Sequence, residues 1–533
     1  MRKKRESYPD VLEIEYRLAD LPSSQHRAGL AGLVLMTSWI KEEYVSRGIC
    51  DVEIGVSSVV FYVDQLGLSE LFNGLYAASR EEQSRPRPMR SLRTREILPP
   101  LREEMRVVSD PVTGLSVRTK VFVYETIVPQ GAFLAELDPS GDEENGLWIR
   151  LWREVVWTIL RAVPATRRPF EARANDEPVT DSLAIWSDLC RGWEHAIQLS
   201  GTCYLGAQSL SAERIPFMDL ARFRFLLNFW PLVAQMYVPV VHDAADDIDF
   251  RGFVIAIPDV RDLVRFKERF SGMLLARGVA PYRARQYRPE EAVIGMIEEA
   301  GLDLLWRLQR QLNGATTPVL AEKVLDGVDL FHLERQGNTV QAINVCRIES
   351  DTALIDRYSR LRGRFDNQLF YRQQISNLLG RSRVWYAGFD QLLTVRPVSR
   401  TISSRTFCRD AAMMLRRSAT ADVEGWEPEI YQVIAEYLDS RSDHATISGG
   451  SGEPKARPGH RRRVKIARET FLALRARRGQ DFIDHFVAVI LAKESGGKTP
   501  SSPETVRLTK ERPDEVRTVA LLSLAAMAGD DSK

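Results

Sequence analysis

The stretch from Leu21 to Ile40 constrains the fold of this chain more than any other. It reads LPSSQHRAGLAGLVLMTSWI, a Leu-Pro turn followed by two serines and an apolar run. Because proline fixes the approach of the chain and serine is a favoured N-cap, a helix is expected to begin near Ser24. From Ala28 to Met36 the run is apolar on all sides, which is typical of a helix surrounded by protein. A bilayer span takes roughly twenty such residues, so we predict a core helix.

Two features of this helix call for further explanation. Gly29 and Gly32 lie one turn apart, and each costs about 1 kcal/mol of helix stability relative to alanine. We expect that close packing of another backbone offsets this cost. His26 and Arg27 lie in the first turn, where free N–H groups attract phosphate, so both are predicted to bind nucleic acid. The alternative is that they only cap or solvate the start of the helix.

The string QHRAGLAGL after the Leu-Pro turn resembles the opening of the large subunit of type I CRISPR Cascade complexes, specifically the MYXAN-subtype large-subunit family. A second block, Phe250 to Phe270, reads FRGFVIAIPDVRDLVRFKERF, a strand followed by a helix around the string IPDV, and resembles the same family. Together the two blocks cover about forty of the 533 residues.

The resemblance implies a subunit of an RNA-guided DNA surveillance complex that is not an enzyme and has no cofactor. It would bind the 5′ end of the guide RNA, recognise the protospacer-adjacent motif of the target, aid R-loop formation and recruit the effector. The implied partners are the CRISPR guide RNA, target double-stranded DNA, the Cascade backbone and handle-binding subunits, the small subunit, and either a helicase-nuclease effector or a transposition module.

The composition is that of an ordinary soluble globular protein, with 44% hydrophobic and 27% charged residues. A chain of 533 residues is too long for one core, so two to four domains are expected. The basic N-terminus leads into no apolar segment, and we expect no signal peptide. The cysteines are odd in number and never paired as CxxC, which favours a reducing cytoplasm over a zinc or disulfide scaffold. They are Cys50, Cys190, Cys203, Cys346 and Cys408.

The patterns of apolar residues predict an α+β fold. Residues 1–400 are expected to form a large mixed region of strands and helices. Its clearest elements are a strand at Val11–Tyr16, strands within Asp51–Asp64, Val117–Ile127 and Ala132–Leu137, helices at Leu66–Glu82 and Leu147–Val163, a largely helical stretch from Glu177 to Val241, and a hairpin at Asp329–Glu349. Trp148 and Trp152 lie four apart on one helix face, which favours a core position. Trp385 to Val395 is expected to be strand and loop.

From residue 401 onward strand signals vanish, and residues 401–533 are expected to form a helical domain. A flexible linker near residues 440–460 is predicted from the SGGSGEP core. By the same resemblance, this region is similar to the small subunit of the complex, which some systems also make from an internal start. Met413 and Met414 stand about 120 residues from the end, the right size for such a product.

Two Arg-rich loops are predicted to bind nucleic acid. The first, Gln83 to Arg95, contains no acid, and its arginines can follow a phosphate backbone. They are Arg85, Arg87, Arg90, Arg93 and Arg95. In the second, Pro281 to Pro289, tyrosines that can stack on unpaired bases alternate with arginines. They are Tyr282, Arg283, Arg285, Tyr287 and Arg288. The alternative for each is a loop that is solvated or packed on its own domain.

A third basic segment runs from Lys455 to Arg478, with ten Lys or Arg residues against one acid, Glu469. It is the strongest electrostatic candidate for a nucleic-acid groove. Its proposed contact residues are Arg461, Arg462, Arg463, Lys465 and Arg468. The helical stretch from Asp351 to Leu379 also carries several arginines, to which the sequence assigns no role: Arg360, Arg362, Arg364 and Arg372.

His242 and Asp243 leave an enzyme open as an alternative. A metal-dependent HD-type nuclease or phosphohydrolase uses such a pair with further His and Asp ligands, because together they hold a cation that activates water. Asp246, Asp247 and Asp249 follow, and His195 is the nearest additional histidine in the sequence. An acidic surface loop before a strand is the commoner meaning of this pattern. A further alternative is a general nucleic-acid-binding scaffold protein.

Overall fold

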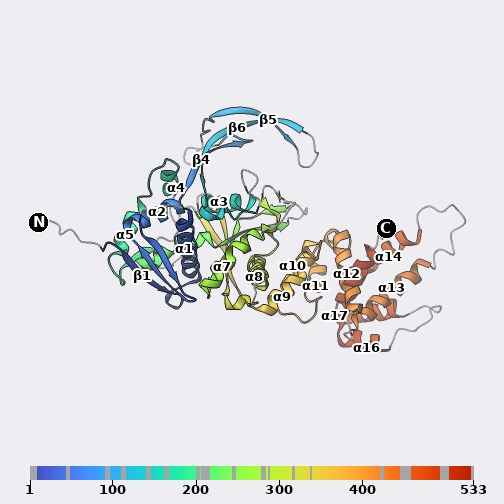
Figure 1. Ribbon diagram of the computed structural model, residues 1–533. Coiled ribbons are helices and arrows are strands. Elements are labelled where there is room, and N and C mark those ends of the chain that lie inside the picture. The colour runs from blue at the N-terminus through green and yellow to red at the C-terminus, as the bar shows by residue number, and fades with distance from the viewer. Residues whose placement is uncertain are drawn as a thin grey trace. The chain divides into compact units, whose positions relative to one another are not determined.

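The structure is a computed structural model of two compact units, residues 1–355 and 356–533 (Figure 1). It describes residues 9–43, 48–89, 96–109, 116–139, 146–160, 167–199, 204–205, 217–242, 248–277, 284–285, 288–314, 318–336, 339–420, 425–443, 458–492 and 503–529. The expected linker near residues 440–460 falls largely outside these ranges. The division between the units lies earlier in the chain than the domain boundary expected after residue 400.

The first unit mixes strands and helices, whereas the second is helical, so the predicted α+β class is confirmed. The strands are β1 (Leu12–Arg17), β2 (Cys50–Ile54), β3 (Ser58–Val63), β4 (Ala78–Arg85), β5 (Arg102–Ser109), β6 (Ser116–Pro129), β7 (Ala196–Leu199), β8 (Phe217–Leu220), β9 (Gln235–His242), β10 (Ile248–Phe250), β11 (Phe253–Val260), β12 (Ala284–Arg285), β13 (Arg288–Pro289), β14 (Val293–Ile294), β15 (Leu325–Gln336) and β16 (Thr339–Glu349). The helices of this unit are α1 (Ser24–Glu43), α2 (Gln65–Leu75), α3 (Leu147–Thr158), α4 (Arg168–Arg173), α5 (Asp181–Leu189), α6 (Ala221–Leu226), α7 (Leu263–Leu275) and α8 (Ile297–Asn313).

The largest sheet of the first unit has the strand order β10-β9-β11-β15-β16, and β14 adds to β9 in parallel. Its strand β11 is buried along its whole length, and β15 and β16 form the predicted hairpin. A smaller sheet, β1-β3-β2, stands at the beginning of the unit. Helix α1 packs against β11. Strand β11 is buried because its neighbours cover both edges and helices supply apolar side chains.

Helix α1 begins at Ser24 as predicted, and its side chains at Ala28, Leu30 and Leu33 are fully buried. The two glycines explain how it packs. A Cβ atom on Gly29 would lie 2.3 Å from the carbonyl oxygen of Leu226, and one on Gly32 would lie 2.3 Å from that of Phe229. The predicted close approach of another backbone is confirmed.

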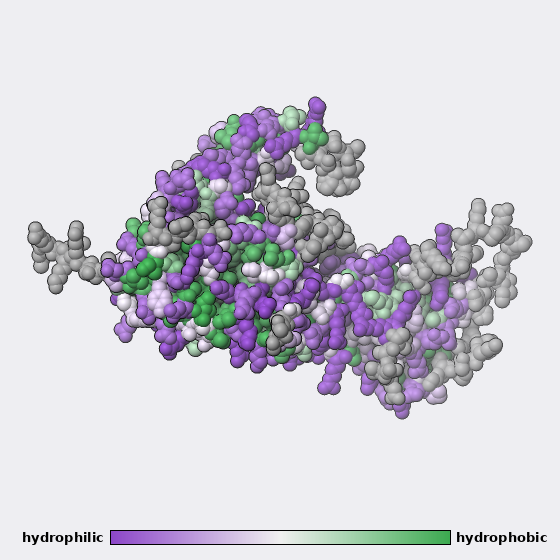
Figure 2. All heavy atoms as spheres, viewed as in Figure 1, coloured by the Kyte–Doolittle hydropathy of each residue, from purple (hydrophilic) through white to green (hydrophobic). Residues whose placement is uncertain are grey.

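A three-stranded antiparallel sheet with the order β4-β6-β5 extends from the rest of the first unit (Figure 1). We call this sheet the wing. Figure 2 shows that its visible surface is mainly hydrophilic, with a few hydrophobic residues. Exposed ion pairs join its strands, such as Arg102 with Glu82 and Lys120 with Glu103. Such pairs contribute little stability each, so the wing is held chiefly by its backbone ladder.

Several predicted elements are wrong, for local reasons. The expected helix at Leu66–Glu82 ends at Leu75, and the chain then enters β4, whose polar side chains gave no strand pattern. Ala132–Leu137 is not a strand, because Gly131 has a φ of 85° and turns the chain into a short 3-10 helix. The stretch from Glu177 to Val241 also contains strands β7, β8 and β9. Residues 389–395 form a helix, not a strand and loop.

The division between the two units falls inside helix α9 (Thr352–Leu361). The other helices of the second unit are α10 (Gln368–Leu379), α11 (Phe389–Val395), α12 (Arg405–Thr420), α13 (Glu427–Asp443), α14 (Pro458–Arg475), α15 (Gly479–His485), a π-helical turn (Phe486–Leu491), α16 (Pro503–Glu511) and α17 (Pro513–Ala528). Helix α17 is buried nearly all round, and α12, α13 and α14 pack on it. The predicted helical character of residues 401–533 is confirmed over the described ranges. No helix in the described ranges is long and apolar enough to cross a membrane.

Candidate nucleic-acid interface

His26 lies in the first turn of α1 and is only 3% exposed. Its Nδ1 lies 2.8 Å from the hydroxyl oxygen of Ser23, and its Nε2 lies 2.9 Å from a carboxylate oxygen of Asp219. The ring also packs edge to face on Phe223. Because both ring nitrogens have partners within the protein, this geometry favours the capping role that the sequence left open.

Arg27 joins the two sequence blocks that carry the family resemblance. Its Nη1 lies 2.8 Å from Oδ1 of Asp259, in the IPDV string of β11, and 3.7 Å from Oδ2 of Asp326. Its Nε donates a hydrogen bond to the carbonyl of Leu18 at 3.2 Å. The side chain is 26% exposed, and the carboxylate of Asp259 is 7% exposed. These contacts make Arg27 a structural link between helix and strand.

A second arginine, which no sequence pattern indicated, also contacts Asp259. Arg347, on β16, places its Nη1 2.9 Å from Oδ2 of Asp259 and 3.2 Å from Oδ1 of Asp329. Burial lowers the pKa of Arg347, but hydrogen bonds to Glu349 and Asp259 outweigh this and raise it above its ordinary value. Ser24 donates its hydroxyl to Asp329. Arg347 is remote in sequence from both blocks, so only the sheet pairing brings it here.

On the wing, Arg85 and Arg87 are both exposed, and neither has an ion pair with a described residue. Arg85 ends β4 and pairs in register with Phe122 of β6. Lys120, from the same face of β6, lies 5.5 Å from the ring of Phe122. Lys120 is paired with Glu103, so Arg85 supplies the free positive charge on this face, beside the ring of Phe122. Arg90, Arg93 and Arg95 lie outside the described residues.

Of the second Arg-rich loop, only Arg288 is described with its side chain. It belongs to β13, its Nη2 lies 3.6 Å from Glu154, and its guanidinium lies 5.0 Å from the ring of Phe250. These contacts fit the alternative of packing on its own domain. The other four members lie outside the residues whose side chains are described: Tyr282, Arg283, Arg285 and Tyr287.

Helix α14 carries the third basic segment and is strongly two-sided. Arg461, Lys465 and Arg468 are exposed at helical spacing, while Ala467 and Phe471 are fully buried. Since residues three and four apart share a helix face, the three cations form one row. At about 1.5 Å per residue the row is about 10 Å long. We call it the α14 row.

The other polar residues of α14 differ in their surroundings. Arg462 is exposed, whereas Arg463 is half-buried and lies 3.2 Å from the carboxylate of Asp439 on α13. Lys465 has Glu469 at 3.9 Å, an exposed pair that is weak in water. The α14 row thus stays available to a polyanion, while Arg463 ties α14 to α13.

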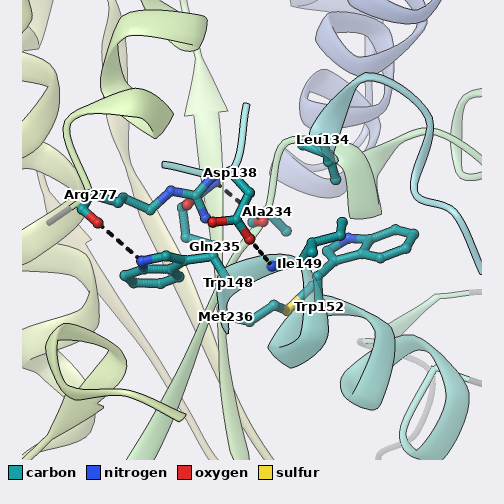
Figure 3. Close-up of a pocket in the computed structure, with 9 residues that line it drawn as sticks. All are labelled: Leu134, Asp138, Trp148, Ile149, Trp152, Ala234, Gln235, Met236 and Arg277. Carbon is teal, nitrogen blue, oxygen red and sulfur yellow. Dashed lines mark hydrogen bonds between the residues drawn. The ribbon is translucent and has the colours of Figure 1, made fainter. Parts of the chain in front are cut away.

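Trp148 and Trp152 are buried, as predicted, and line a small cavity of about 20 Å³ (Figure 3). The indole of Trp148 donates to the carbonyl of Arg277 at 3.1 Å, and Asp138 accepts from the backbone N–H of Ile149 at 2.8 Å. Burial lowers the pKa of the Arg277 guanidinium to about 9. A space of this size holds about one water, so we interpret the cluster as structural.

His242 ends β9 with its side chain outside the described residues, as are Asp243, Asp246 and Asp247. Asp249 pairs with Arg251 at 3.1 Å, and His195 lies 3.5 Å from Asp188. Among the residues that the structure describes, no group of three or more His, Cys, Asp or Glu could hold a metal ion.

Two family models match the chain in succession. The type I-B CRISPR Cas8b N-terminal domain matches residues 49–317, and the type I-B CRISPR Cas8b C-terminal domain matches residues 325–527. No curated protein matches it. The two matches together span most of the chain and meet close to the β15 strand.

Proposed function

We propose the function of this chain from its family: it belongs to the type I-B CRISPR Cas8b family and is the large subunit of a type I-B Cascade complex. The large-subunit resemblance of the two sequence blocks is thereby confirmed. We further propose that the subunit is not a catalyst. In this role it binds the 5′ end of the guide RNA, recognises the protospacer-adjacent motif of double-stranded DNA, aids R-loop formation and recruits the effector.

The physical basis is a division of labour. Guide pairing reads the target sequence, whereas the protein reads a few base pairs and the shape and charge of the duplex. Such a protein needs exposed basic side chains whose charge is not neutralised within the fold. Phosphate contacts then supply affinity, and base contacts supply selectivity.

The observation that carries the proposal is the α14 row. Arg461, Lys465 and Arg468 face outward because the opposite side of α14 is buried in the bundle. This fixed presentation suits contact with displaced or target-strand phosphates without regard to sequence.

We propose a different role for the wing. Arg85, at the end of β4, and Arg87, just after it, are exposed and are candidates for reading the flanking motif, and the Tyr282–Arg288 loop is the other candidate. Arginine is the side chain best suited to this, because its fork pairs with two acceptors of guanine in the major groove. Replacing Arg85 with glutamine should change which flanking motifs are accepted.

The test of the α14 row uses the assembled complex with guide RNA. The triple variant Arg461→Gln, Lys465→Gln, Arg468→Gln should weaken binding of all targets alike, by about tenfold or more at moderate salt. Each lost phosphate contact should also reduce the slope of log affinity against log salt by about 0.9. Affinity is measured by gel shift over a salt series, with several flanking motifs.

A matched triple on α16 and the start of α17 provides the control. Arg507, Lys510 and Arg512 are exposed. Arg507 lies near Glu511 of α16, and Arg512, which precedes α17, lies near Glu515 of that helix. Changing these three to glutamine removes the same charge and should leave the salt slope unchanged. A change in flanking-motif preference caused by the α14 triple would contradict the proposed division of roles.

A further inference from the structure

A second basic site lies within the second unit and contains no residue of the segments singled out for nucleic-acid binding. It is a cavity of about 340 Å³ between α9, α10, α12 and the loop 382–385. Five arginines and no acid are among the described residues that line it: Arg357, Arg360, Arg364, Arg383 and Arg417. The sequence showed a concentration of arginine at 360–372, but only the fold adds Arg383 and Arg417 to it.

Three of these five arginines are not paired with any acid that the structure describes. Arg357, Arg360 and Arg383 are exposed and have no ion pair with any described residue. Arg364 stacks on its neighbour Phe365 at 5.8 Å, which leaves its charge in place. Positive charges close together repel each other, so an anion bound in this cavity would be stabilised by the arginines that line it.

The wall of the cavity is fixed by buried side-chain amides. Gln374 and Asn377 of α10 both donate to the carbonyl oxygen of Trp385 at 2.8 Å, and both are less than a tenth exposed. The turn that brings the loop back to α10 passes through Arg381, a non-glycine residue with a φ of 51°. The loop 382–385 is therefore held against α10 before any ligand arrives.

The inner surface adds apolar and aromatic character to this charge. Trp385 lines the cavity together with Leu378, Val384 and Met414. A lining that combines cations with apolar and aromatic side chains suits a ligand that is anionic at one end and flat and apolar at the other. A nucleotide has this character, since its phosphate pairs with arginine and its base packs on aromatic and apolar side chains.

We propose that this cavity binds one unpaired nucleotide of a single-stranded nucleic acid, with the backbone crossing the arginines at its mouth. This inference rests on the proposed function. It assigns a class of ligand to a cavity that has no role in that function as stated above. Paired bases are stacked within a duplex, so only a strand that is displaced or not yet paired can place a base in such a space. The unpaired charges of Arg357, Arg360 and Arg383 also exceed the charge of one phosphate, which matches a strand with successive phosphates.

The test uses the purified full-length chain and two probes, a twelve-nucleotide oligothymidylate and the corresponding oligouridylate, each with one 5-iodouracil. Ultraviolet crosslinking followed by peptide mass spectrometry should place the modified base on residues 382–385 or on Met414. The same oligonucleotides with a fluorescent end measure affinity by anisotropy. Comparison of the two probes shows whether DNA or RNA is preferred.

The charge of the cavity is tested at Val384, which is 38% exposed and so tolerates polar substitution. Val384→Glu places a carboxylate among the arginines and should lower affinity by about tenfold and abolish the crosslink. Val384→Gln has the same size without the charge and should retain both. The double variant Arg360→Gln, Arg383→Gln should lose binding as Val384→Glu does, with an unchanged melting temperature.

Two results would overturn the inference. Unchanged binding by Val384→Glu, with crosslinks outside the cavity, would show that single strands bind elsewhere. Loss of the crosslink in the presence of ATP, together with weak oligonucleotide binding, would assign the cavity to a free nucleotide. Either result leaves the α14 test intact, because the proposed function fails separately if the assembled complex shows no salt-dependent target binding.

Discussion

The guanidinium of Arg27 lies 2.8 Å from the carboxylate of Asp259. One residue belongs to the QHRAGLAGL string of α1 and the other to the IPDV string of β11, so the two blocks that carry the resemblance in the sequence meet at this ion pair. Arg347 approaches the same carboxylate from β16. We interpret these residues as determinants of the fold, which place the helix on the central strand of the first unit.

Arg27→Met should lower the stability of the chain. It removes one of two partners of a carboxylate that is only 7% exposed, while Arg347 keeps the other. A fully orphaned buried charge costs about 3–5 kcal/mol, so we expect a loss of about 1–2 kcal/mol here. Urea denaturation measures it. The exposed pair of Arg17 with Glu15 provides the control, and Arg17→Met should change stability by less than about 0.5 kcal/mol.

Gly29→Ala should destabilise the first unit, although alanine is the better helix former. Its methyl group would lie 2.3 Å from the carbonyl oxygen of Leu226, a backbone atom that cannot move aside cheaply. Overpacking of this kind costs about 1–3 kcal/mol, more than the helix propensity regained. Gly314→Ala is the control, since its new methyl group meets atoms only at 3.7 Å or beyond. A variant at Gly29 as stable as the parent would contradict this packing.

The elements predicted correctly are those whose residues carry a periodic or capping signal of their own. The α1 helix has a serine start and apolar core positions, and the β15–β16 hairpin alternates over two long strands. Trp148 and Trp152 share a helix face and are buried. In each case local sequence and tertiary packing favour the same structure, so the pattern was sufficient.

The sequence could not predict what depends on distant partners. Strand β4 reads ASREEQSR and is a strand because β6 pairs with it along its whole length. The position of Arg347 beside Arg27, and of Arg383 beside Arg360, follows from sheet pairing and helix packing between segments far apart in the chain. Burial of His26 against Asp219 is of the same kind, since Asp219 shows no signal in the sequence.

The stability of the second unit should depend on pH through the carboxyl of Asp410, which is 2% exposed. Burial raises the pKa of its carboxyl to about 6, although the backbone N–H of Asn367, at 2.8 Å, opposes the change. Because the folded pKa lies above the ordinary value of about 3.9, the folded state holds the proton more tightly. The carboxyl of Asp410 therefore makes its full contribution to the free energy of unfolding below about pH 4. This contribution is lost as the pH rises through about 6, by at most about 3 kcal/mol.

The measurement for Asp410 compares the parent with Asp410→Asn by urea denaturation with pulse proteolysis of the 356–533 region. The difference between the two proteins should change between pH 4 and pH 6 and be constant above pH 7. Asp481→Asn serves as the control, because that carboxylate is 72% exposed. A parallel pH dependence in parent and Asp410→Asn would show that Asp410 does not carry the effect.

An internal start at Met413 or Met414 remains a prediction, and the fold shows what it would remove. Both residues lie inside α12, and a product starting there would lack Phe407 and Ala411, which are fully buried. We expect the native coding sequence to yield a second chain of about 120 residues, which Met413→Leu with Met414→Leu abolishes. Because its core is incomplete, this chain should be less stable alone than within the full-length protein. Detection of full-length chain only would count against the prediction.

Arg517 should be the most sensitive charged residue of the helical unit. It is fully buried on α17 and donates to the carbonyl oxygens of Leu474 at 3.3 Å and Arg475 at 2.7 Å, in the last turn of α14. It also pairs with Asp390 of α11. A cation at the C-terminal end of a helix satisfies carbonyl groups that have no partner within the helix. Arg517 thereby fixes the helix that carries the α14 row.

Arg517→Leu should cost about 3 kcal/mol, because it leaves Asp390 and the two carbonyl groups without their donor. Arg517→Lys should recover only part of this, since a single ammonium group cannot reach all three partners. Thermal denaturation measures the loss, with Arg507→Leu, at a side chain 70% exposed, as the neutral control. If the α14 row acts as proposed, Arg517→Leu should also weaken target binding of the assembled complex without changing motif preference. Normal stability of Arg517→Leu would refute this capping arrangement.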